Sequence, residues 1–348
     1  MPSSRKVVVF GGTGFVGSPL VQALAEQGAD VTVVARRNRR TESWPSSVRL
    51  VPGDAGDRQL VMALTEGADA VYLMTAGSAT AWEDWKRAFV DSAATVADCC
   101  QKNHVRRMIY VSSIAALYLG DPGKTVDESA GVDSHSAERS FYARAKVEAE
   151  KLLLERHTGQ GLPLVIVRPG IVVGAGGMLN HSGLGNWASD MCCLGWGAGE
   201  NPLPFVLVQD VTSALVSALD SPDAVGMAFN LAGDYRPSAR EFFARLQKQS
   251  GRPYRYYPQS LAKTQLLEIG KWFVKFVARR DGLSFPSYRD LKSRSLRTSL
   301  DCSRAKKVLG WKPSGDPALF YHDALEIHLQ PIPQGDLRLS GGAALATS

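Results

Sequence analysis

The chain has 348 residues, of which 45% are hydrophobic and 21% are charged, and its formal net charge is +6. This is the composition of a globular protein with enough residues for a large core, and the mild positive charge suits an anionic ligand. The sequence has no apolar run that could span a bilayer, no basic run interleaved with aromatic residues and no signal peptide. We therefore expect a cytoplasmic protein that does not bind nucleic acid.

The five cysteines have no spacing typical of a zinc site or of a disulfide framework. They include two pairs of adjacent residues, and their number is odd. We predict that the protein holds no metal and that a reducing compartment suits it best.

Segments with the patterns of strands and helices alternate through the first half of the chain. Runs of β-branched and aromatic residues predict strands at 7–10, 30–35, 48–51, 70–74, 108–111 and 163–167. Helical spacing of apolar residues predicts helices at 18–27, 59–65, 85–101 and 137–156. This alternation predicts an α/β fold of the Rossmann type, a doubly wound parallel sheet with helices on both faces.

The pattern is looser after Gly170. Residues 174–204 are rich in Gly, Asn and Trp and are interpreted as a loop. Further strands are predicted at 205–208 and 228–231, and helices at 211–219, 238–250, 261–280 and 303–309. The helix at 261–280 is either continuous or broken at Gly270. Residues 331–348 are rich in Gly, Ala and Ser and are predicted to be disordered.

A glycine-rich turn lies between the first predicted strand and the first predicted helix. Gly11, Gly14 and Gly17 have the GxxGxxG spacing. Residues without a Cβ let the backbone turn tightly and approach a pyrophosphate, and the helix that follows offers unpaired N–H groups at its start. The position between strand and helix predicts a dinucleotide-binding turn rather than an unrelated glycine turn.

The residues after the second predicted strand favour NADP(H) over NAD(H). Enzymes that bind NAD usually have an acidic residue there, which accepts hydrogen bonds from the ribose 2′-hydroxyl. Here Ala35 is followed by Arg36 and Arg37, whose guanidinium groups suit a 2′-phosphate. A solvated basic loop is the alternative interpretation. Asp54, after the third strand, is expected either to bind the adenine amino group or to stabilise a turn.

Tyr142 and Lys146 form a YxxxK motif within a predicted helix. Their spacing puts both side chains on one helix face, where a lysine ammonium would lower the tyrosine pKa from its usual value of about 10. Tyr142 is therefore predicted to exchange a proton with a substrate alcohol or carbonyl. Ser113, with Ser112 as the second choice, follows the fifth predicted strand and is expected to hydrogen-bond the substrate oxygen.

Together these motifs resemble the extended short-chain dehydrogenase/reductase family, also called the NAD-dependent epimerase/dehydratase family. The resemblance covers about residues 5 to 315 and includes three further landmarks, Arg168-Pro169-Gly170, Val208-Gln209-Asp210 and Leu309-Gly310-Trp311-Lys312-Pro313. It implies an NADP-binding Rossmann domain at 1–170, whose core extends through about residue 230, and a mainly substrate-binding domain at 171–330. The site would lie between them. Members of the family are often dimers, so a homodimer is an open alternative.

The resemblance also implies a set of site residues. The expected catalytic residues are Ser113, Tyr142 and Lys146, and residues 169–172 would lie along the nicotinamide. The expected cofactor-binding residues are Gly11, Thr13, Gly14, Phe15, Val16, Gly17, Arg36, Arg37, Asp54, Ala55, Thr75, Ala76, Tyr142, Lys146, Pro169, Gly170, Ile171 and Val172.

Three departures from the family pattern narrow the expected chemistry. Ile114-Ala115-Ala116 follows Ser113, so the acid that sugar-nucleotide dehydratases carry there is missing. Residues 202–205, Pro-Leu-Pro-Phe, stand where sugar-nucleotide epimerases often have an arginine, and Asp91 stands where the family usually has an asparagine. The pattern is nearest to hydroxysteroid dehydrogenases and dihydroflavonol-type reductases, which implies an apolar ketone or secondary alcohol as substrate.

We therefore predict an NADP(H)-dependent oxidoreductase that acts on such a substrate. Two alternatives stay open, a sugar-nucleotide epimerase with tightly bound NAD(P) and a non-catalytic NADP-binding regulatory protein. The apolar side chains after the nicotinamide segment are expected either to line the substrate pocket or to pack in the smaller domain. These are Leu179, Trp187, Met191, Leu194 and Trp196. His181 is expected to be a surface or core residue rather than a substrate contact. The apolar and basic segment 266–280 is expected to pack as core or lid, with a membrane surface or a dimer contact as alternatives.

Overall fold

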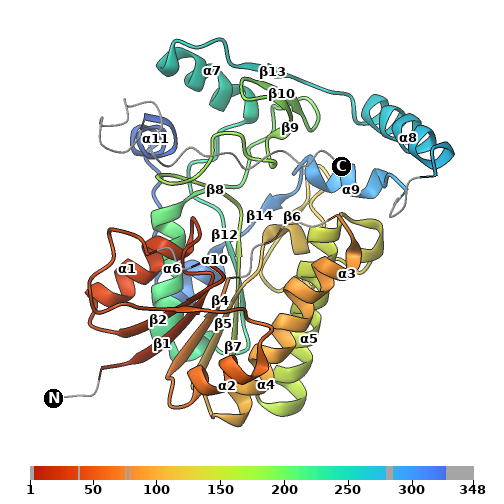
Figure 1. Ribbon diagram of the computed structural model, residues 1–348. Coiled ribbons are helices and arrows are strands. Elements are labelled where there is room, and N and C mark those ends of the chain that lie inside the picture. Colours follow the sequence, from red (N-terminus) through yellow and green to blue (C-terminus); the bar gives the residue numbers. More distant parts are fainter. Residues whose placement is uncertain (1–3, 38–39, 75–76, 78–79, 280–284, 327–348) are drawn as a thin grey trace.

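Short apolar segments, most of them fully buried, form the main sheet of the molecule (Figure 1). The computed structural model describes residues 4–37, 40–74, 77, 80–279 and 285–326. The strands of this sheet are β1 (Lys6–Phe10), β2 (Asp30–Ala35), β3 (Arg49–Pro52), β4 (Ala70–Leu73), β5 (Arg107–Val111), β7 (Leu164–Pro169) and β12 (Ala228–Leu231). All are parallel, in the order β12-β7-β5-β4-β1-β2-β3. The order reverses between β1 and β4, which is where ligands bind in sheets of this kind.

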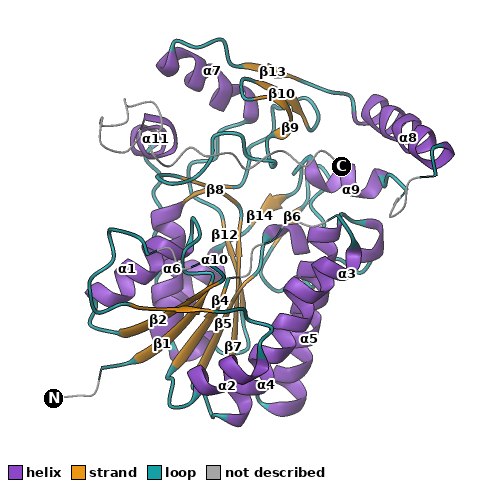
Figure 2. Ribbon diagram, viewed as in Figure 1, coloured by secondary structure: helices purple, strands orange, loops and turns teal. Residues whose placement is uncertain are grey.

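Helices cover both faces of this sheet (Figure 2). On one face lie α1 (Gly17–Glu26), α6 (Val208–Asp220) and α10 (Ser303–Leu309), and on the other lie α2 (Arg58–Thr65), α4 (Ser92–Lys102) and α5 (Phe141–Gln160). Successive residues of β1 point to opposite faces, so Val9 packs with Leu20 of α1 and Val8 packs in the core that contains Leu153 of α5. The prediction of a Rossmann-type doubly wound fold is confirmed.

A second group of elements lies above the carboxyl ends of the main strands (Figure 1). It contains a two-stranded sheet of β8 (Ile171–Val173) and β11 (Phe205–Leu207). A three-stranded sheet has the order β13 (Arg255–Tyr257), β10 (Cys192–Gly195) and β9 (Gly185–Ser189), and the helices are α7 (Ala239–Ser250) and α11 (Pro317–Tyr321). Phe205, Phe242 and Phe320 pack in a separate core, in which the first two rings are stacked 5.0 Å apart. The division of the chain into two domains stays a prediction.

The expectation of a loop at 174–204 is wrong, because β9 and β10 form an antiparallel pair there. The glycines that suggest a loop are needed for close packing. A Cβ on Gly185 would lie 2.3 Å from the carbonyl oxygen of Leu194, and one on Gly195 would lie 2.0 Å from the hydroxyl of Tyr256. Both strands are also partly exposed, so their apolar pattern is weak.

Several predicted helices have different limits in the structure. The helix expected at 137–156 begins at Phe141, because Arg139 is buried and binds Asp133 at 2.7 Å and Asp290 at 3.1 Å instead of continuing a helical face. The helix expected at 85–101 consists of α3 (Trp82–Trp85), a wider turn at Lys86–Asp91, and α4. The segment expected at 261–280 is one helix, α8 (Leu261–Val277), without a break at Gly270.

No helix in the described part of the chain is long and apolar enough to cross a bilayer. The tail predicted to be disordered, 331–348, lies outside the described residues.

A buried ion pair joins α5 to β7, and we predict that removing one partner costs much more stability than replacing both. Glu150 accepts from Arg168 at 2.7 Å, and neither side chain is more than 2% exposed. Glu150→Gln should lower the free energy of unfolding by about 3 kcal/mol, because Arg168 stays charged and buried without its partner. Replacing both residues by Met should recover much of that loss, as measured by urea denaturation.

The pair Arg144–Glu148 on the same helix serves as a control, because both side chains are 30% exposed at a distance of 2.7 Å. Glu148→Gln should change the stability by less than about 0.5 kcal/mol. Equal losses for Glu148→Gln and Glu150→Gln would contradict a dominant role for the buried pair.

Candidate active site

One large cleft, of about 1990 Å³, runs along the carboxyl edge of the main sheet and continues between the sheet and the upper group of elements. The residues that follow β1, β2, β3, β5 and β7 line it, since parallel strands bring their carboxyl ends to the same edge. The sequence motifs lie on these segments. The cleft therefore brings together residues that are far apart along the chain, and the described members of the expected site can be located within it.

The glycine turn between β1 and α1 has the close packing that the sequence indicates. Gly11 has a φ of +85°, and a Cβ on it would lie 2.1 Å from the carbonyl oxygen of Met74. A Cβ on Gly17 would lie 2.3 Å from the carbonyl oxygen of Gly11. A Cβ on Gly14 would meet only the Gly11 oxygen, at 3.3 Å, so this residue opens onto the cleft. No side chain caps the first turn of α1. A turn whose glycines leave the backbone open to the cleft, at an uncapped helix N-terminus, fits a dinucleotide phosphate.

The far end of this part of the cleft contains Ala35, Arg36, Asp54 and Ala55. Arg36 is exposed on the lining. Arg37 is exposed but lies beyond the described lining residues. Asp54 accepts a hydrogen bond from the Gly56 N–H at 2.9 Å, which is the turn interpretation, and it also borders the cleft.

Some predicted cofactor contacts cannot be located. Thr75 and Ala76 lie outside the described residues.

Arg40, which follows Arg36 and Arg37 closely in the sequence, has another role. Its guanidinium donates to the carbonyl oxygen of Val48 at 2.7 Å and so stabilises its own loop. Asp91 is exposed, lies 3.8 Å from the Lys86 ammonium and is not among the described lining residues, so its position gives it no direct contact with the cleft.

Tyr142 and Lys146 of α5 meet Ser113, which follows β5, on one wall of the cleft. The Ser113 hydroxyl lies near enough to that of Tyr142 to lower the tyrosine pKa. The Tyr142 ring makes edge contacts with Trp85 and Phe89, with centroids 6.0 Å apart in both cases. Ser112, the second choice, is buried, and its hydroxyl has no hydrogen-bond partner within the described structure. Of the two serines, Ser113 is the one that contacts the tyrosine.

Lys146 is almost completely buried behind Tyr142. Its ammonium donates to the Val111 carbonyl oxygen at 2.8 Å and lies 4.9 Å from the centre of the Phe89 ring and 5.0 Å from that of Tyr110. The distance from Lys146 Nζ to the centre of the Tyr142 ring is 6.0 Å. The lysine is therefore held by the end of β5 and by aromatic faces.

The electrostatics differ from the sequence expectation. Tyr142 is open to the cleft, yet the surrounding protein withdraws its hydroxyl from bulk water and raises its pKa, with the Ser113 hydroxyl acting in the opposite direction. Burial lowers the pKa of Lys146 to about 7, and the Glu150 carboxylate opposes this effect. The expected lowering of the tyrosine pKa by the lysine is not found, because burial is the dominant effect at both groups.

The nicotinamide segment expected at Pro169–Val172 lines the same cleft. Gly170 is required there, because a Cβ would lie 2.0 Å from the carbonyl oxygen of Pro204. This close approach joins the end of β7 to the segment that leads into β11. The segment lies on the same lining as Tyr142 and Ser113, and its expected contact with the nicotinamide stays a prediction.

The upper part of the cleft is lined by large apolar side chains together with polar and charged ones, among them Lys271 and Arg294. Trp187, Leu194 and Trp196 line it, whereas Leu179 packs in the upper core and Met191 is exposed outside the described lining. The sequence analysis missed a second set of lining residues, which come from α8, from α9 (Tyr288–Arg294) and from the segment before α9. They include Leu267, Trp272, Phe285 and Leu291. The apolar character of 266–280 was their only signal, and it did not indicate which side faces the cleft.

His181 also lines the cleft, contrary to its interpretation as an ordinary surface or core residue. Its Nδ1 accepts the Gly183 N–H at 2.9 Å, so the proton of the neutral ring is on Nε2. Burial lowers the pKa of His181 to about 4, and the ring is therefore neutral at physiological pH. Among the described residues, no group of three or more His, Cys, Asp or Glu side chains could hold a metal ion.

Comparison with known proteins gives the family. Residues 7–232 match the sequence model of the NAD dependent epimerase/dehydratase family. The chain belongs to this family. Membership of the epimerase/dehydratase family supports a nicotinamide dinucleotide as the cofactor and does not distinguish NAD from NADP.

Relatives within the epimerase/dehydratase family include both epimerases and reductases. The chain is 26% identical over 326 residues to a UDP-glucose 4-epimerase of Vibrio cholerae, with 90% of this chain and 92% of that protein covered. It is 26% identical over 329 residues to a 3-diazoavenalumate denitrifying reductase of a Streptomyces species, with 89% and 96% covered. A putative dihydroflavonol 4-reductase of Synechocystis is 31% identical over 173 residues, which span 48% of this chain and 49% of that protein.

Solved structures of the family agree in fold. DesIV, a dTDP-glucose 4,6-dehydratase from Streptomyces venezuelae solved with NAD, has a TM-score of 0.70 at 20% identity and covers 93% of this chain and 97% of its own. MoeE5, solved with UDP-glucuronic acid and NAD, has a TM-score of 0.69 at 20% identity, with 93% and 98% covered. At this identity the likeness establishes the fold and leaves the reaction open.

Burial of Lys146 predicts an unusual stability gain on its removal. Its folded pKa is about 7 and an unfolded lysine titrates near 10.4, so between these values the unfolded state binds more protons and stability rises with pH. Lys146→Met should therefore stabilise the protein at pH 7, by on the order of 2 kcal/mol after loss of the Val111 hydrogen bond, and the gain should shrink toward pH 10. Urea denaturation at both pH values measures this.

Lys151→Met on the same helix is the control, because Lys151 is exposed. It should change stability little at either pH. The explanation fails if Lys146→Met destabilises the protein equally at pH 7 and pH 10.

Proposed function

We propose that the protein is an NADP(H)-dependent oxidoreductase that transfers a hydride to or from an apolar ketone or secondary alcohol. The observation that carries this proposal is the pair of hydroxyl groups of Ser113 and Tyr142 on the wall of a cleft that also contains the glycine turn. The large apolar side chains of the upper cleft, Trp187, Trp196 and Trp272, suit an apolar substrate, and they lie among charged side chains that include Lys271 and Arg294. The bound nicotinamide would supply the hydride, and the protein would supply orientation and proton transfer.

Ser113 and Tyr142 would share the substrate oxygen. The Ser113 hydroxyl would hold this oxygen by a hydrogen bond, and the Tyr142 hydroxyl would give it a proton as negative charge develops there. Because burial raises the pKa of Tyr142, the hydroxyl keeps its proton at neutral pH, which suits the acid of carbonyl reduction. Lys146 would hold the nicotinamide ribose and adjust the proton affinity of Tyr142. A cytoplasmic location and a homodimer remain predictions.

A sugar-nucleotide epimerase is the second candidate, because the Vibrio cholerae epimerase matches 90% of this chain. Against it stands the segment 202–205, in which Leu203 and Phe205 are buried and the arginine that epimerases often carry there is missing. An epimerase regenerates its cofactor in each cycle. Net oxidation of NADPH with a ketone would therefore favour the oxidoreductase, and tightly retained cofactor without net consumption would favour the epimerase.

A non-catalytic NADP-binding regulatory protein is the third candidate. The paired hydroxyls of Ser113 and Tyr142 argue against it, because a protein that only senses the dinucleotide has no need of a proton donor beside the nicotinamide segment. Tight binding of NADPH together with no turnover across a broad panel of carbonyl compounds would favour this candidate.

Tyr142→Phe tests the proposed acid. The variant keeps the ring contacts with Trp85 and Phe89 and removes only the hydroxyl. The value of kcat/KM should fall by about 10²–10⁴-fold, the usual contribution of a positioned general acid, while NADPH affinity changes by less than about twofold. Steady-state kinetics and fluorescence titration measure the two effects. Retention of full activity would remove Tyr142 from the reaction.

Arg36→Ala tests the choice of dinucleotide. Arg36 is the basic side chain on the lining next to Asp54, so its removal should weaken NADPH binding by roughly 10–100-fold and leave NADH binding nearly unchanged. Arg106→Ala is the matched control, since it removes one charge from an exposed arginine 3.9 Å from Asp69 on the surface. Equal affinities of the wild type for NADPH and NADH would overturn the preference.

A further inference from the structure

Helix α8 (Leu261–Val277) has an unusual lack of burial. None of its residues is buried. Six large apolar side chains are between 58% and 70% exposed: Leu266, Leu267, Phe273, Val274, Phe276 and Val277. The helix lies at the edge of the molecule beside α9 (Figure 1). Isolated exposed apolar residues are ordinary, but a continuous group of this kind on one helix marks a contact surface.

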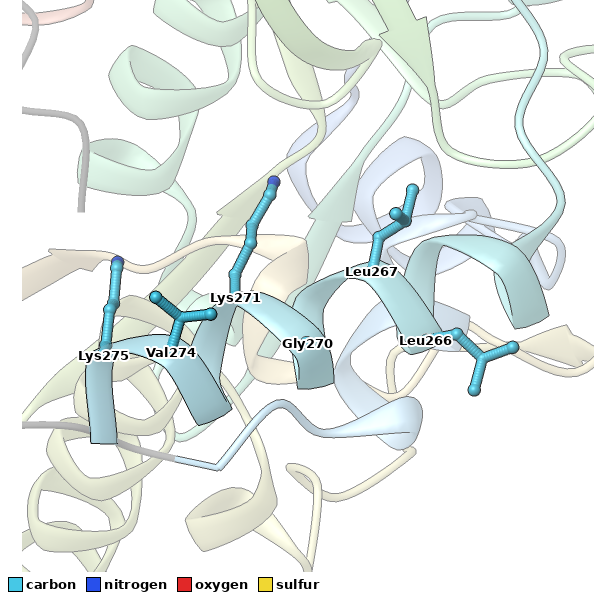
Figure 3. Close-up of a pocket in the computed structure, with 6 residues that line it drawn as sticks. All are labelled: Leu266, Leu267, Gly270, Lys271, Val274 and Lys275. Carbon is cyan, nitrogen blue, oxygen red and sulfur yellow. The ribbon is translucent and has the colours of Figure 1, made fainter. Parts of the chain in front are cut away.

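The side of α8 that borders the cleft carries both polar and apolar residues, and its two lysines are themselves exposed. Thr264, Glu268, Lys271 and Lys275 line the cleft, together with Leu267 and Trp272. Leu266, Phe273, Val274, Phe276 and Val277 are absent from the described cleft lining and are exposed. In Figure 3, Lys271, Lys275, Leu267 and Val274 extend to the same side of the helix and Leu266 points away from them. The exposed apolar side chains form an outward face that the rest of the described protein leaves largely uncovered, so this face suits an apolar environment.

We propose that the outward face of α8 docks on a lipid surface that carries anionic headgroups. The charge of the helix complements such a surface, since Lys263, Lys271 and Lys275 are present against the single acidic residue Glu268, and the exposed Arg279 follows the helix. Apolar side chains flanked by basic ones are the features by which a helix lies in the plane of a membrane interface. Each basic residue near an anionic membrane adds about 1 kcal/mol to the binding.

An aromatic cluster at the end of α8 also suits docking on a lipid surface. The Trp272 ring stacks on Phe276 at 5.1 Å and makes an edge contact with Phe285 at 5.2 Å. Phe276 and Phe285 are among the most exposed large apolar residues. Aromatic rings with one polar atom, such as that of Trp272, are enriched at the boundary between headgroups and acyl chains.

The size of the face favours a lipid surface over a second copy of the chain. A helix of 17 residues is about 25 Å long and about 10 Å wide, so one face presents roughly 250 Å². A stable protein interface needs about 800 Å² from each partner. Two copies that met through α8 would also bring their lysines together. A lipid surface needs no such area and attracts these charges.

The docking has a consequence for the substrate, which rests on the proposed function. Leu267 and Trp272 line the cleft from the same helix whose outer face would touch the lipid. The cleft mouth would therefore lie at the lipid surface, where an apolar ketone or alcohol is concentrated. The docking itself does not depend on the reaction, and it is measured without turnover.

Flotation of the full-length chain with vesicles tests the docking. The wild type should bind vesicles of phosphatidylcholine mixed with phosphatidylglycerol more tightly than vesicles of phosphatidylcholine alone, and salt should weaken the difference. Phe273→Glu combined with Val274→Glu should weaken binding by at least about tenfold, because both apolar contacts are lost. Lys263→Glu, which changes a residue outside the described cleft lining, should weaken binding only to the anionic vesicles.

Val225→Glu combined with Leu319→Glu is the matched control, because both residues are exposed apolar side chains on other elements. This variant should bind vesicles as the wild type does, and NADPH binding should be retained in all variants as a check of folding. Absence of vesicle binding by the wild type would overturn the proposal. So would a wild-type dimer in light scattering that becomes a monomer in the α8 variant, because a second copy would then cover the face. Loss of turnover with intact vesicle binding would count against the proposed reaction alone.

Discussion

The crossing of α5 over β5 and β7 is the constraint on which the candidate site depends. Tyr142, Lys146 and Glu150 follow one another at intervals of four residues and therefore lie on one face of α5. Glu150 binds Arg168 of β7, and Lys146 binds the last carbonyl of β5. Because these two contacts are buried and charged, they allow little rotation or sliding of the helix. The orientation of Tyr142 toward Ser113 is thus fixed by groups further along the same helix.

The same crossing explains the electrostatics of the site. A lysine that lies between aromatic rings and a strand end loses most of its hydration, so its pKa falls to about 7 even though Glu150 is near. The tyrosine beside it keeps its proton for the same reason. At neutral pH Lys146 is close to a change of charge. A negative group brought into the cleft would favour the ammonium form of Lys146, which links cofactor binding to the protonation of the site.

The sequence alone predicted the main sheet and the turns at its edge better than the upper group of elements. The strands of the main sheet are buried on both faces, so their apolar runs are clear, and the glycine turn and the YxxxK pair are local patterns. The contacts of Arg139 with Asp290 join residues far apart in the chain, and no local pattern indicates them. The hairpin β9–β10 and the orientation of α8 were missed because short, partly exposed elements leave little periodicity. The direction of the Tyr142 pKa shift depends on burial, which spacing does not reveal.

This difference has a physical basis that also bears on function. The end of the cleft at the glycine turn lies at the edge of the main sheet, where the position of a few glycines decides the shape of the backbone. The upper end is made of side chains from α8, α9 and the β9–β10 region. Epimerases and reductases can therefore share the first end and differ at the second. Helix α8 belongs to this upper end, where Leu267 and Trp272 line the cleft while Phe273 and Val274 stay exposed, so a single helix borders both the cleft and the outside of the molecule.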